Sequence, residues 1–416
     1  MKRIVSRPIK DIALGIYDGP HATPKEAEDG PIFLGISEIT PDGRLRTENA
    51  KRLSEADFET WTRRVTPQEN DIVFTYEATL HRYALIPSDF RACLGRRLGL
   101  VRPNPKFVVP KWLHYYMLSA QWRSVVESNV ISGATVDRIP IKRFPDFPVD
   151  VPPLSLQETA VEILEPYDAL IENNRRRMAL LEQAARQIYD EWFVRLRFPG
   201  HERSKLTESP LGMVPEQWRV VTLGDITTKI GSGATPRGGG AAYHEEGITL
   251  IRSLNVYDFR FDTDGLAFIT DEQADELSNV TVQENDILLN ITGASVCRCC
   301  MVPPRLLPAR VNQHVMIIRT DTEKADPFYV LCAINSDQRK RQLLSYAQVG
   351  STREALTKTT VSNFQVVLPE PRVLSDFSEQ ARDIFHQCDI LMAQTAKLTQ
   401  ARDLLLPRLM SGEIEV

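Results

Sequence analysis

Cysteines, histidines and a glycine-rich stretch are the features of this sequence whose residue types suit chemistry. Residues 297–300 read CRCC, which crowds thiols into one short segment. We expect buried or half-exposed strand cysteines there and no zinc site. Residues 231–240 read GSGATPRGGG and lack the Lys and the following Ser or Thr of a phosphate-binding loop. His21 and His314 lie near Thr or Gln and form no recognisable catalytic cluster in sequence.

Motifs for nucleotide and metal chemistry are also absent from the sequence. No G-x-x-x-x-G-K-[ST] loop, no H-E-x-x-H pair and no G-x-G-x-x-G turn between a strand and a helix occurs. The segment NPKF at 104–107 differs from the Asn-Pro-Pro-aromatic motif of amino-methyltransferases. The sequence therefore predicts a chain without catalytic activity of its own.

Composition places the chain among ordinary globular proteins. The 416 residues are 42% hydrophobic and 25% charged. No apolar core of signal-peptide length follows the basic start, and the apolar run FYVLCAI (328–334) is too short to span a membrane. Six cysteines in so long a chain suggest no disulfide framework, so we expect a reducing cytoplasm. The net charge of −5 leaves open whether a local basic face binds nucleic acid.

A pentapeptide that occurs twice indicates a duplication of the chain. QENDI stands at 68–72 and again at 283–287, both times before a strand-like apolar run. An offset of 217 positions also aligns Ser119 with Ser336, and further matches stay in order across both halves. We therefore interpret the chain as a tandem duplication, against the alternative of chance similarity. The pentapeptide is predicted to be a turn that begins the same strand twice.

The first part of each half is predicted to be a mixed domain. Short β-type runs alternate with Gly, Pro and Asp turn signals. One amphipathic helix interrupts each set of runs, at 110–127 and at 326–345, with a Pro near its start. The predicted strands lie at 31–39, 71–76, 97–103, 248–256, 286–292 and 314–320.

The second part of each half is predicted to be a long helix. Apolar residues from Leu164 to Trp192, and again from Leu374 to Leu398, follow the 3–4 stride of a coiled-coil seam. Ordinary amphipathic helices in a globular core are the alternative. Pro166 falls in the first turns, where it would kink the helix or mark its effective start.

The fold class predicted from these patterns is α+β, with a mixed domain followed by a long helix, twice. The boundaries are 1–152 for the first domain, 153–198 for the central helix, 199–368 for the second domain and 369–416 for the distal helix. The 38 residues from Ser155 to Trp192 would extend about 57 Å as a helix. That length lies within two DNA turns of about 34–36 Å each, so duplex DNA is a suitable extended, pseudo-symmetric ligand.

Several motifs stand in the order known from one protein family. IYDGPHATP (16–24) is similar to the start of one target recognition domain, and GSGATPRGG, NQHVMIIR and GSTREALTKTTVSNFQVVLPEP are similar to parts of a second. The run from VPPLSLQETAVEIL to the Trp-Phe of ARQIYDEWF resembles a central helical region, and LTQARDLLLPRLMSGEI (398–414) resembles a distal one. Over essentially its full length the chain thus resembles the specificity subunit of type I restriction-modification systems.

The resemblance implies an architecture and a set of partners. Each target recognition domain would bind one half of a bipartite site in double-stranded DNA, and the two helices would pair as an antiparallel coiled coil that sets the spacer. Two modification subunits, which bind S-adenosylmethionine and methylate adenine, would dock on the chain. Restriction subunits, which are translocases and nucleases dependent on ATP and Mg, would join them. The chain itself would be a non-catalytic cytoplasmic subunit without cofactor, metal or membrane contact.

Loops that follow the shared framework are the candidate DNA-binding segments. Arg, Lys, Asn and Gln suit base contacts, and Ser or Thr suit phosphate contacts. The two halves diverge directly after QENDI, as two different half-sites would require. For each Arg, a plain surface charge is the alternative, and the two Thr-Pro pairs are also compatible with simple turns. The candidates are His21, Thr23, Lys25, His81, Arg82, Arg138, Ser232, Thr235, Arg237, Ser295, Arg298, Gln313, His314 and Arg353.

The central helix carries the candidate partner-binding residues. NNRRRM (173–178) places Arg175, Arg176 and Arg177 on the exposed side of the helix, although a run of charges is usually only solvated. Trp192 and Phe193 end the helix in the motif that resembles the family. Two other functions remain as alternatives: a DNA-modifying enzyme with an unrecognised active site, and a scaffold protein that binds no nucleic acid.

Overall fold

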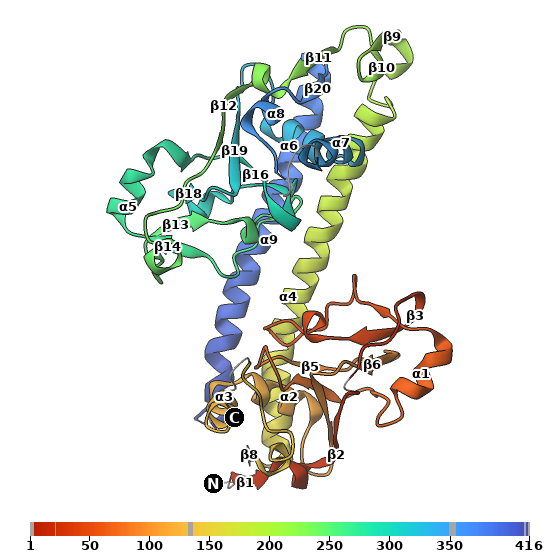
Figure 1. The fold of residues 1–416 in the computed structure, drawn as a ribbon, viewed down its shortest axis with the longest axis vertical. Coiled ribbons are helices and arrows are strands. Elements are labelled where there is room, and N and C mark those ends of the chain that lie inside the picture. Colours follow the sequence, from red (N-terminus) through yellow and green to blue (C-terminus); the bar gives the residue numbers. More distant parts are fainter. Residues whose placement is uncertain (1–3, 21, 132–135, 349–354, 412, 415–416) are drawn as a thin grey trace. The chain divides into compact units, whose positions relative to one another are not determined.

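The computed structural model describes residues 4–20, 22–131, 136–348, 355–411 and 413–414. The chain divides into two compact units, which we call unit 1 (1–172 with 395–416) and unit 2 (173–394). Each unit contains one mixed domain and one end of each of two long helices (Figure 1).

Unit 1 builds its mixed domain mainly on one antiparallel sheet. Its strands are β1 (Val5–Pro8), β2 (Ala13–Asp18), β3 (Ala27–Leu34), β4 (Ile72–Thr75), β5 (Tyr83–Leu85), β6 (Ala92–Leu94), β7 (Leu98–Pro103) and β8 (Pro148–Val151). Its short helices are α1 (Glu55–Trp61), α2 (Pro110–Leu118) and α3 (Ala120–Glu127). The main sheet has the order β2-β7-β4-β5, β3 pairs with β6 in parallel, and β1 pairs with β8.

Unit 2 repeats this plan with a few additions. Its strands are β9 (Leu206–Ser209), β10 (Gly212–Pro215), β11 (Arg219–Thr222), β12 (Thr227–Ser232), β13 (Ile248–Ile251), β14 (Ala267–Ile269), β15 (Thr281–Val282), β16 (Ile287–Asn290), β17 (Cys299–Met301), β18 (Ala309–Val311), β19 (Val315–Thr320) and β20 (Gln365–Leu368). Its short helices are α5 (Asp271–Glu276), α6 (Pro327–Asn335), α7 (Asp337–Gln348) and α8 (Lys358–Ser362).

The two mixed domains share their strand order. The antiparallel sheet β12-β19-β16-β17 of unit 2 corresponds to β2-β7-β4-β5 of unit 1. The parallel pair β13-β18 corresponds to β3-β6, and β11-β20 corresponds to β1-β8. Five of the six predicted strands contain an observed strand, and the sixth, 31–39, only overlaps the end of β3 and continues into a 3-10 turn (Ile36–Glu38). The predicted duplication is confirmed.

The central strand of each main sheet is buried on both faces. In β16, Ile287 and Leu289 join the core that includes the helices, and Leu288 points into a second core with β13 and β18. In β4, Ile72 and Phe74 face the helical core and Val73 the opposite one. Alternation of side chains across a strand explains this division. The central strands β4 and β16 are therefore buried on both faces, and the side chains most accessible to a ligand lie on the edge strands, at the strand ends and in the loops.

One prediction about the short helices is wrong in both units. Each predicted single helix is two, because Ser119 and Ser336 take extended conformations with ψ of 157° and 141°. The Ser119 hydroxyl donates to Tyr116 O at 2.6 Å, and the Ser336 hydroxyl donates to Ala333 O at 2.9 Å. Serine competes for backbone partners in this way at helix ends, and an apolar period alone does not reveal it.

The repeated pentapeptide forms the predicted turn before β4 and before β16. Asn70 and Asn285 occupy the left-handed region with φ of 69° and 63°, which asparagine tolerates better than most residues. Its aspartate is completely buried in unit 2, where Asp286 accepts two hydrogen bonds from Arg319 at 2.8 and 2.7 Å. In unit 1 the equivalent carboxylate accepts from Arg102 at 2.8 Å twice. The pentapeptide is therefore framework, as predicted.

The long helices are α4 (Leu154–Tyr189), extended by a π-helical turn (Asp190–Val194), and α9 (Pro371–Met410). Since α4 begins at Leu154, Pro166 does not mark its start. All predicted seam residues are buried or half-buried. No helix in the described parts of the chain is both long and apolar enough to cross a membrane.

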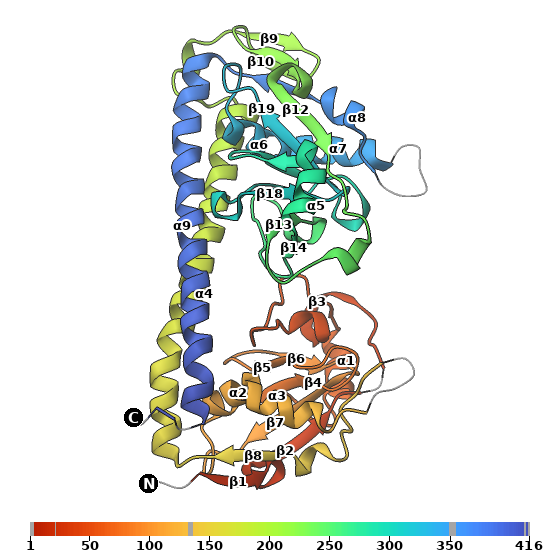
Figure 2. The ribbon, with the colours of Figure 1, turned by 90° about the vertical axis from the view of Figure 1, so that its left-hand side faces the viewer.

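The two long helices pair antiparallel. In unit 1, Leu164 of early α4 lies in one core with Leu406 and Leu409 of late α9. In unit 2, Phe193 after the end of α4 packs on Phe377 of early α9, with ring centroids 4.9 Å apart. In each unit, therefore, the beginning of one long helix packs against the end of the other. Figure 2 shows the two helices side by side. The coiled-coil prediction is confirmed.

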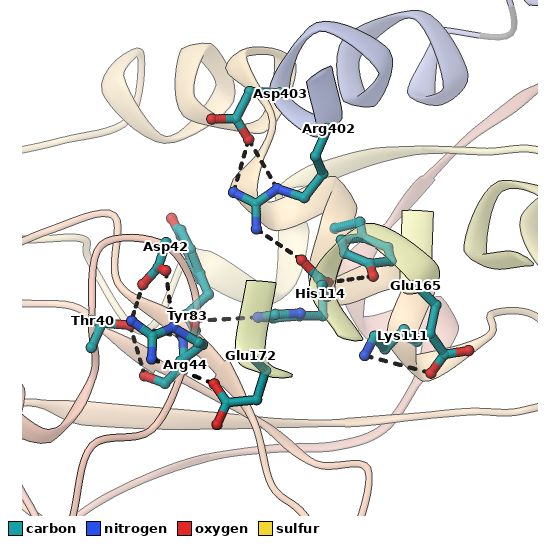
Figure 3. Close-up of polar contacts among 12 residues, drawn as sticks. Thr40, Asp42, Arg44, Tyr83, Lys111, His114, Glu165, Glu172, Arg402 and Asp403 are labelled. Carbon is teal, nitrogen blue, oxygen red and sulfur yellow. Dashed lines mark hydrogen bonds and ion pairs between the residues drawn. The ribbon is translucent and has the colours of Figure 1, made fainter. Parts of the chain in front are cut away.

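Polar contacts join the mixed domain of unit 1 to the helices (Figure 3). Asp168 of α4 accepts hydrogen bonds from Tyr115 at 2.6 Å and from Arg402 of α9 at 2.8 Å. Lys111 of α2 lies 3.7 Å from Glu165 of α4. At the equivalent positions of unit 2, Cys332, Phe385 and Ala185 share one apolar core. The two attachments are thus alike in position, and unit 2 has apolar residues where unit 1 has the Asp168 contacts, while Arg382 of α9 pairs with Asp326 at 3.2 Å.

His114 lies beneath this attachment and provides a pH-dependent contribution to stability. Its Nε2 lies 3.3 Å from Tyr83 O, and burial lowers its pKa from 6.5 to about 4. Because the folded state binds fewer protons, this contribution is complete above about pH 6.5 and is lost as the pH falls through about 4. We expect a loss of about 3 kcal/mol over that interval. Urea unfolding at several pH values should show it, and His114→Phe should flatten the slope; an unchanged slope would contradict the assignment.

Candidate nucleic-acid interface

One end of the main sheet in unit 1 gathers the loops predicted to bind DNA. β2 ends there at Asp18, which pairs with Gly99 near the start of β7. β4 ends there at Thr75, opposite Leu98, and Tyr83 begins β5 beside them. Chain segments distant in sequence therefore leave the sheet at the same end of its strands. We call this end of the sheet the loop end of unit 1.

Three predicted residues lie at the loop end of unit 1. Thr75 N donates to Arg82 O at 3.0 Å, and Arg138 forms an isolated bridge with Glu77 just beyond β4. His81 has a positive φ of 62°, and its Nε2 lies 3.7 Å from Glu127. Burial, with a smaller effect of Arg123, lowers the pKa of His81. His81 therefore favours the neutral form and suits a hydrogen bond more than a phosphate ion pair.

The corresponding end of the main sheet in unit 2 brings together the residues predicted to bind DNA in the second half of the chain. β12 ends at Ser232 opposite Met316, and β16 ends at Asn290 opposite Val315. Cys299 begins β17 beside them. We call this end of the sheet the loop end of unit 2. Ser232, Arg298, Gln313 and His314 lie on or within two residues of these strand ends, and Ser295 lies in the loop between β16 and β17.

Arg298 of unit 2 occupies the same framework position as Arg82 of unit 1. Asn290 N donates to Arg298 O at 2.9 Å, which repeats the bond from Thr75 to Arg82. The preceding residues, Cys297 and His81, both have positive φ. The Arg298 guanidinium stacks on Tyr257 at 4.5 Å from the ring centroid. Stacking restrains a long side chain and lowers the entropy lost when it binds.

The remaining predicted residues lie farther from the strand ends. Thr23, Lys25 and Arg237 are exposed in loops, and Thr235 has a buried hydroxyl without a hydrogen-bond partner. His21 and Arg353 lie outside the residues that the structure describes.

Sequence reasoning missed two arginines of unit 1. Tyr76 N donates to Arg97 O at 3.1 Å, just as Ile291 N donates to His314 O at 3.0 Å. Arg96 and Arg97 are therefore the counterparts of Gln313 and His314. The offset of 217 positions aligns both pairs, but unlike residue types conceal the match until the backbone bonds are compared.

The predicted partner-binding residues differ in exposure. Arg176 and Arg177 of α4 are exposed, Arg175 and Trp192 are half-buried, and Phe193 is buried. Phe193 packs between Tyr329 and Phe377, with centroids 5.0 and 4.9 Å away. Its role in the structure is to hold the helix ends to the core of unit 2.

The cysteines have the chemistry of core residues. All six are free and buried. Burial raises the pKa of Cys299 and of Cys300, so these thiols stay protonated and are poor nucleophiles and ligands. Within the described ranges, no group of three or more His, Cys, Asp and Glu residues is placed to hold a metal ion.

Fold and site together define a duplicated α+β protein that carries two similar frameworks with different loops. The model of the type I restriction modification DNA specificity domain matches this chain twice, over residues 46–183 and 215–396. The chain therefore belongs to that family, and its role is that of a DNA sequence-specificity subunit.

Individual relatives agree with this family over most of their length. The type I restriction enzyme HindI specificity subunit of Haemophilus influenzae is 22% identical over 398 residues, which cover 80% of this chain and 84% of the relative. The MjaIX specificity subunit of Methanocaldococcus jannaschii is 22% identical over 74% of this chain and 70% of its own. The crystal structure of the S subunit from M. genitalium has the same fold, with a TM-score of 0.51, 15% identity and coverage of 97% and 95%.

Proposed function

We propose that each unit binds one half of a bipartite DNA site through its loop end, while the paired helices set the distance between the halves. The observation that carries this proposal is the repeated framework with different side chains at the loop ends. Identical backbone bonds hold Arg82 in unit 1 and Arg298 in unit 2, yet the surrounding side chains differ. Two similar frameworks with unlike contact residues suit two unlike half-sites.

The partners in this proposal dock on the helices. Two modification subunits would contact the exposed side of α4, where Arg176 and Arg177 lie, and restriction subunits would join the complex. S-adenosylmethionine, ATP and Mg would bind to those partners. Two relatives are named as specificity subunits of type I restriction enzymes, which supports an assembly with further subunits, and we place that assembly in the cytoplasm.

The chain itself is proposed to be non-catalytic. The sequence contains none of the nucleotide- or metal-binding motifs considered above, and the thiols of β17 are buried and protonated, which supports this proposal. Incubation of the purified chain alone with DNA and S-adenosylmethionine is expected to yield no methylated adenine, and the complex with modification subunits is expected to yield it. Methylation by the chain alone would overturn this part of the proposal.

Replacement of Arg298 tests base contact at the loop end of unit 2. We expect Arg298→Ala in the complex with modification subunits to relax the preference at one base pair of one half-site, at a cost of about 1–3 kcal/mol. Competition binding with single-base variants of the site measures this. Arg260→Ala is the matched control, because Arg260 stacks on the same Tyr257 at 4.8 Å from its centroid. An equal loss of affinity on every sequence would make Arg298 a phosphate contact.

A further inference from the structure

One pair of side chains stands at an equivalent place in both loop ends and differs completely in chemistry. In unit 1, Arg97 Nε lies 3.3 Å from Glu77 Oε1. In unit 2, His314 Nδ1 lies 2.7 Å from Thr292 Oγ1. Neither pair belongs to the buried framework, since the side chains of Arg97 and Glu77 are 34% and 32% exposed and His314 is half-buried.

Three chain segments fix the position of this pair in each unit. The first two segments are joined by the bonds from Tyr76 N to Arg97 O and from Ile291 N to His314 O. The third segment donates from Ile139 N to Tyr76 O at 2.7 Å, and its counterpart donates to Ile291 O at 2.8 Å.

The bridges next to these bonds also correspond. Glu77 forms an isolated bridge with Arg138, and Thr292 forms one with Ala355. The backbone thus places residues 77 and 97 as it places residues 292 and 314, and only the side chains distinguish the two loop ends here.

The two pairs would present different groups to a base edge. Arg97 faces Glu77 with its Nε, so its two terminal nitrogens can form the bidentate contact that arginine makes with guanine O6 and N7. His314 uses Nδ1 on the Thr292 hydroxyl and presents Nε2 alone, which can make a single hydrogen bond. A forked donor and a single ring nitrogen select different bases.

On the basis of the proposed function, we propose that Arg97 and His314 are equivalent specificity-determining residues for the two half-sites, held by the positioning residues Glu77 and Thr292. Arg97 selects guanine at its base pair. His314 selects at the corresponding place in the other half-site through one hydrogen bond. The identity of these four side chains then sets one base of each half-site.

Exchange of the pair between units tests this assignment. The variant Thr292→Glu with His314→Arg gives unit 2 the pair of unit 1, in the full chain assembled with modification subunits. Methylation of a random-sequence DNA library, followed by sequencing of adenine methylation, measures the preferred motif. We expect a change in preference on the order of tenfold at one position of one half-site, toward guanine. The other half-site and the spacer should stay as in the wild type.

A matched control and a milder variant keep the result interpretable. His201→Arg with Thr207→Glu makes the same substitutions in unit 2 outside the main sheet and should leave the motif unchanged. His314→Gln tests the position if the double variant fails to fold, and it should alter the same base pair. An unchanged motif, or an equal loss of methylation on all sequences, would overturn the assignment. If the wild type methylates no bipartite motif at all, the proposed function fails instead.

Discussion

Replacement of Asp286 by alanine is expected to lower the free energy of unfolding of unit 2 by about 3 kcal/mol. Its carboxylate is completely buried, accepts two hydrogen bonds from Arg319 and also accepts one from Gln283 N at 2.7 Å. Removal of the carboxylate leaves the partly buried Arg319 guanidinium without its counter-charge. Urea unfolding of the full chain, with hydrogen exchange to locate the change, measures the effect.

The pentapeptide offers its own control for this prediction. Glu284 lies two residues away in the same turn and is exposed, so Glu284→Ala should change stability by less than about 0.5 kcal/mol. Asp71→Ala, the equivalent change in unit 1, should weaken hydrogen-exchange protection there by a similar amount, because Asp71 pairs with Arg102 in the same way. A loss for Asp286→Ala no larger than that for Glu284→Ala would show that the ion pair is not what stabilises the turn.

Lengthening both long helices by one heptad is expected to change the spacer of the DNA site and leave both half-sites intact. Duplication of residues 174–180 in α4 and of 388–394 in α9 preserves the seam, in which Asn174 and Leu391 are buried. Seven residues extend a helix by about 10.5 Å. That corresponds to about three base pairs at about 3.4 Å each. The motif methylated by the complex, determined by sequencing, gives the result.

Insertion in α4 alone is the control for this experiment. It breaks the match between the two seams, so we expect loss of methylation and reduced stability instead of a new spacer. A change in the half-sites with an unchanged spacer would show that the helices do not set the distance. The same outcome would place sequence selection partly in the helices.

The repeated architecture could be predicted from sequence because each of its signals is local. QENDI, the period-2 runs and the 3–4 stride from Leu164 to Trp192 each depend on neighbouring residues, and the structure confirms the elements that they predict. The breaks at Ser119 and Ser336 were missed, because a hydroxyl that bonds three residues back leaves the apolar period intact.

The contacts between distant segments could not be predicted in the same way. Arg102 and Arg319 lie at the ends of predicted strands, and nothing in sequence shows that they reach the pentapeptide aspartates. The polar contacts of Asp168 with Tyr115 and Arg402 join three elements, and unit 2 replaces them with apolar residues. Arg97 could not be predicted as a site residue for a related reason, because its counterpart His314 is a different residue type.

Methylation-aware sequencing of DNA modified by the assembled complex tests the central claim most directly. The account predicts one adenine-methylated motif made of two specific half-sites separated by a fixed number of unspecified base pairs. The exchange of Thr292 and His314 for the residues of unit 1 should then alter one half-site only. A continuous motif without a spacer, or methylation independent of sequence, would contradict the account.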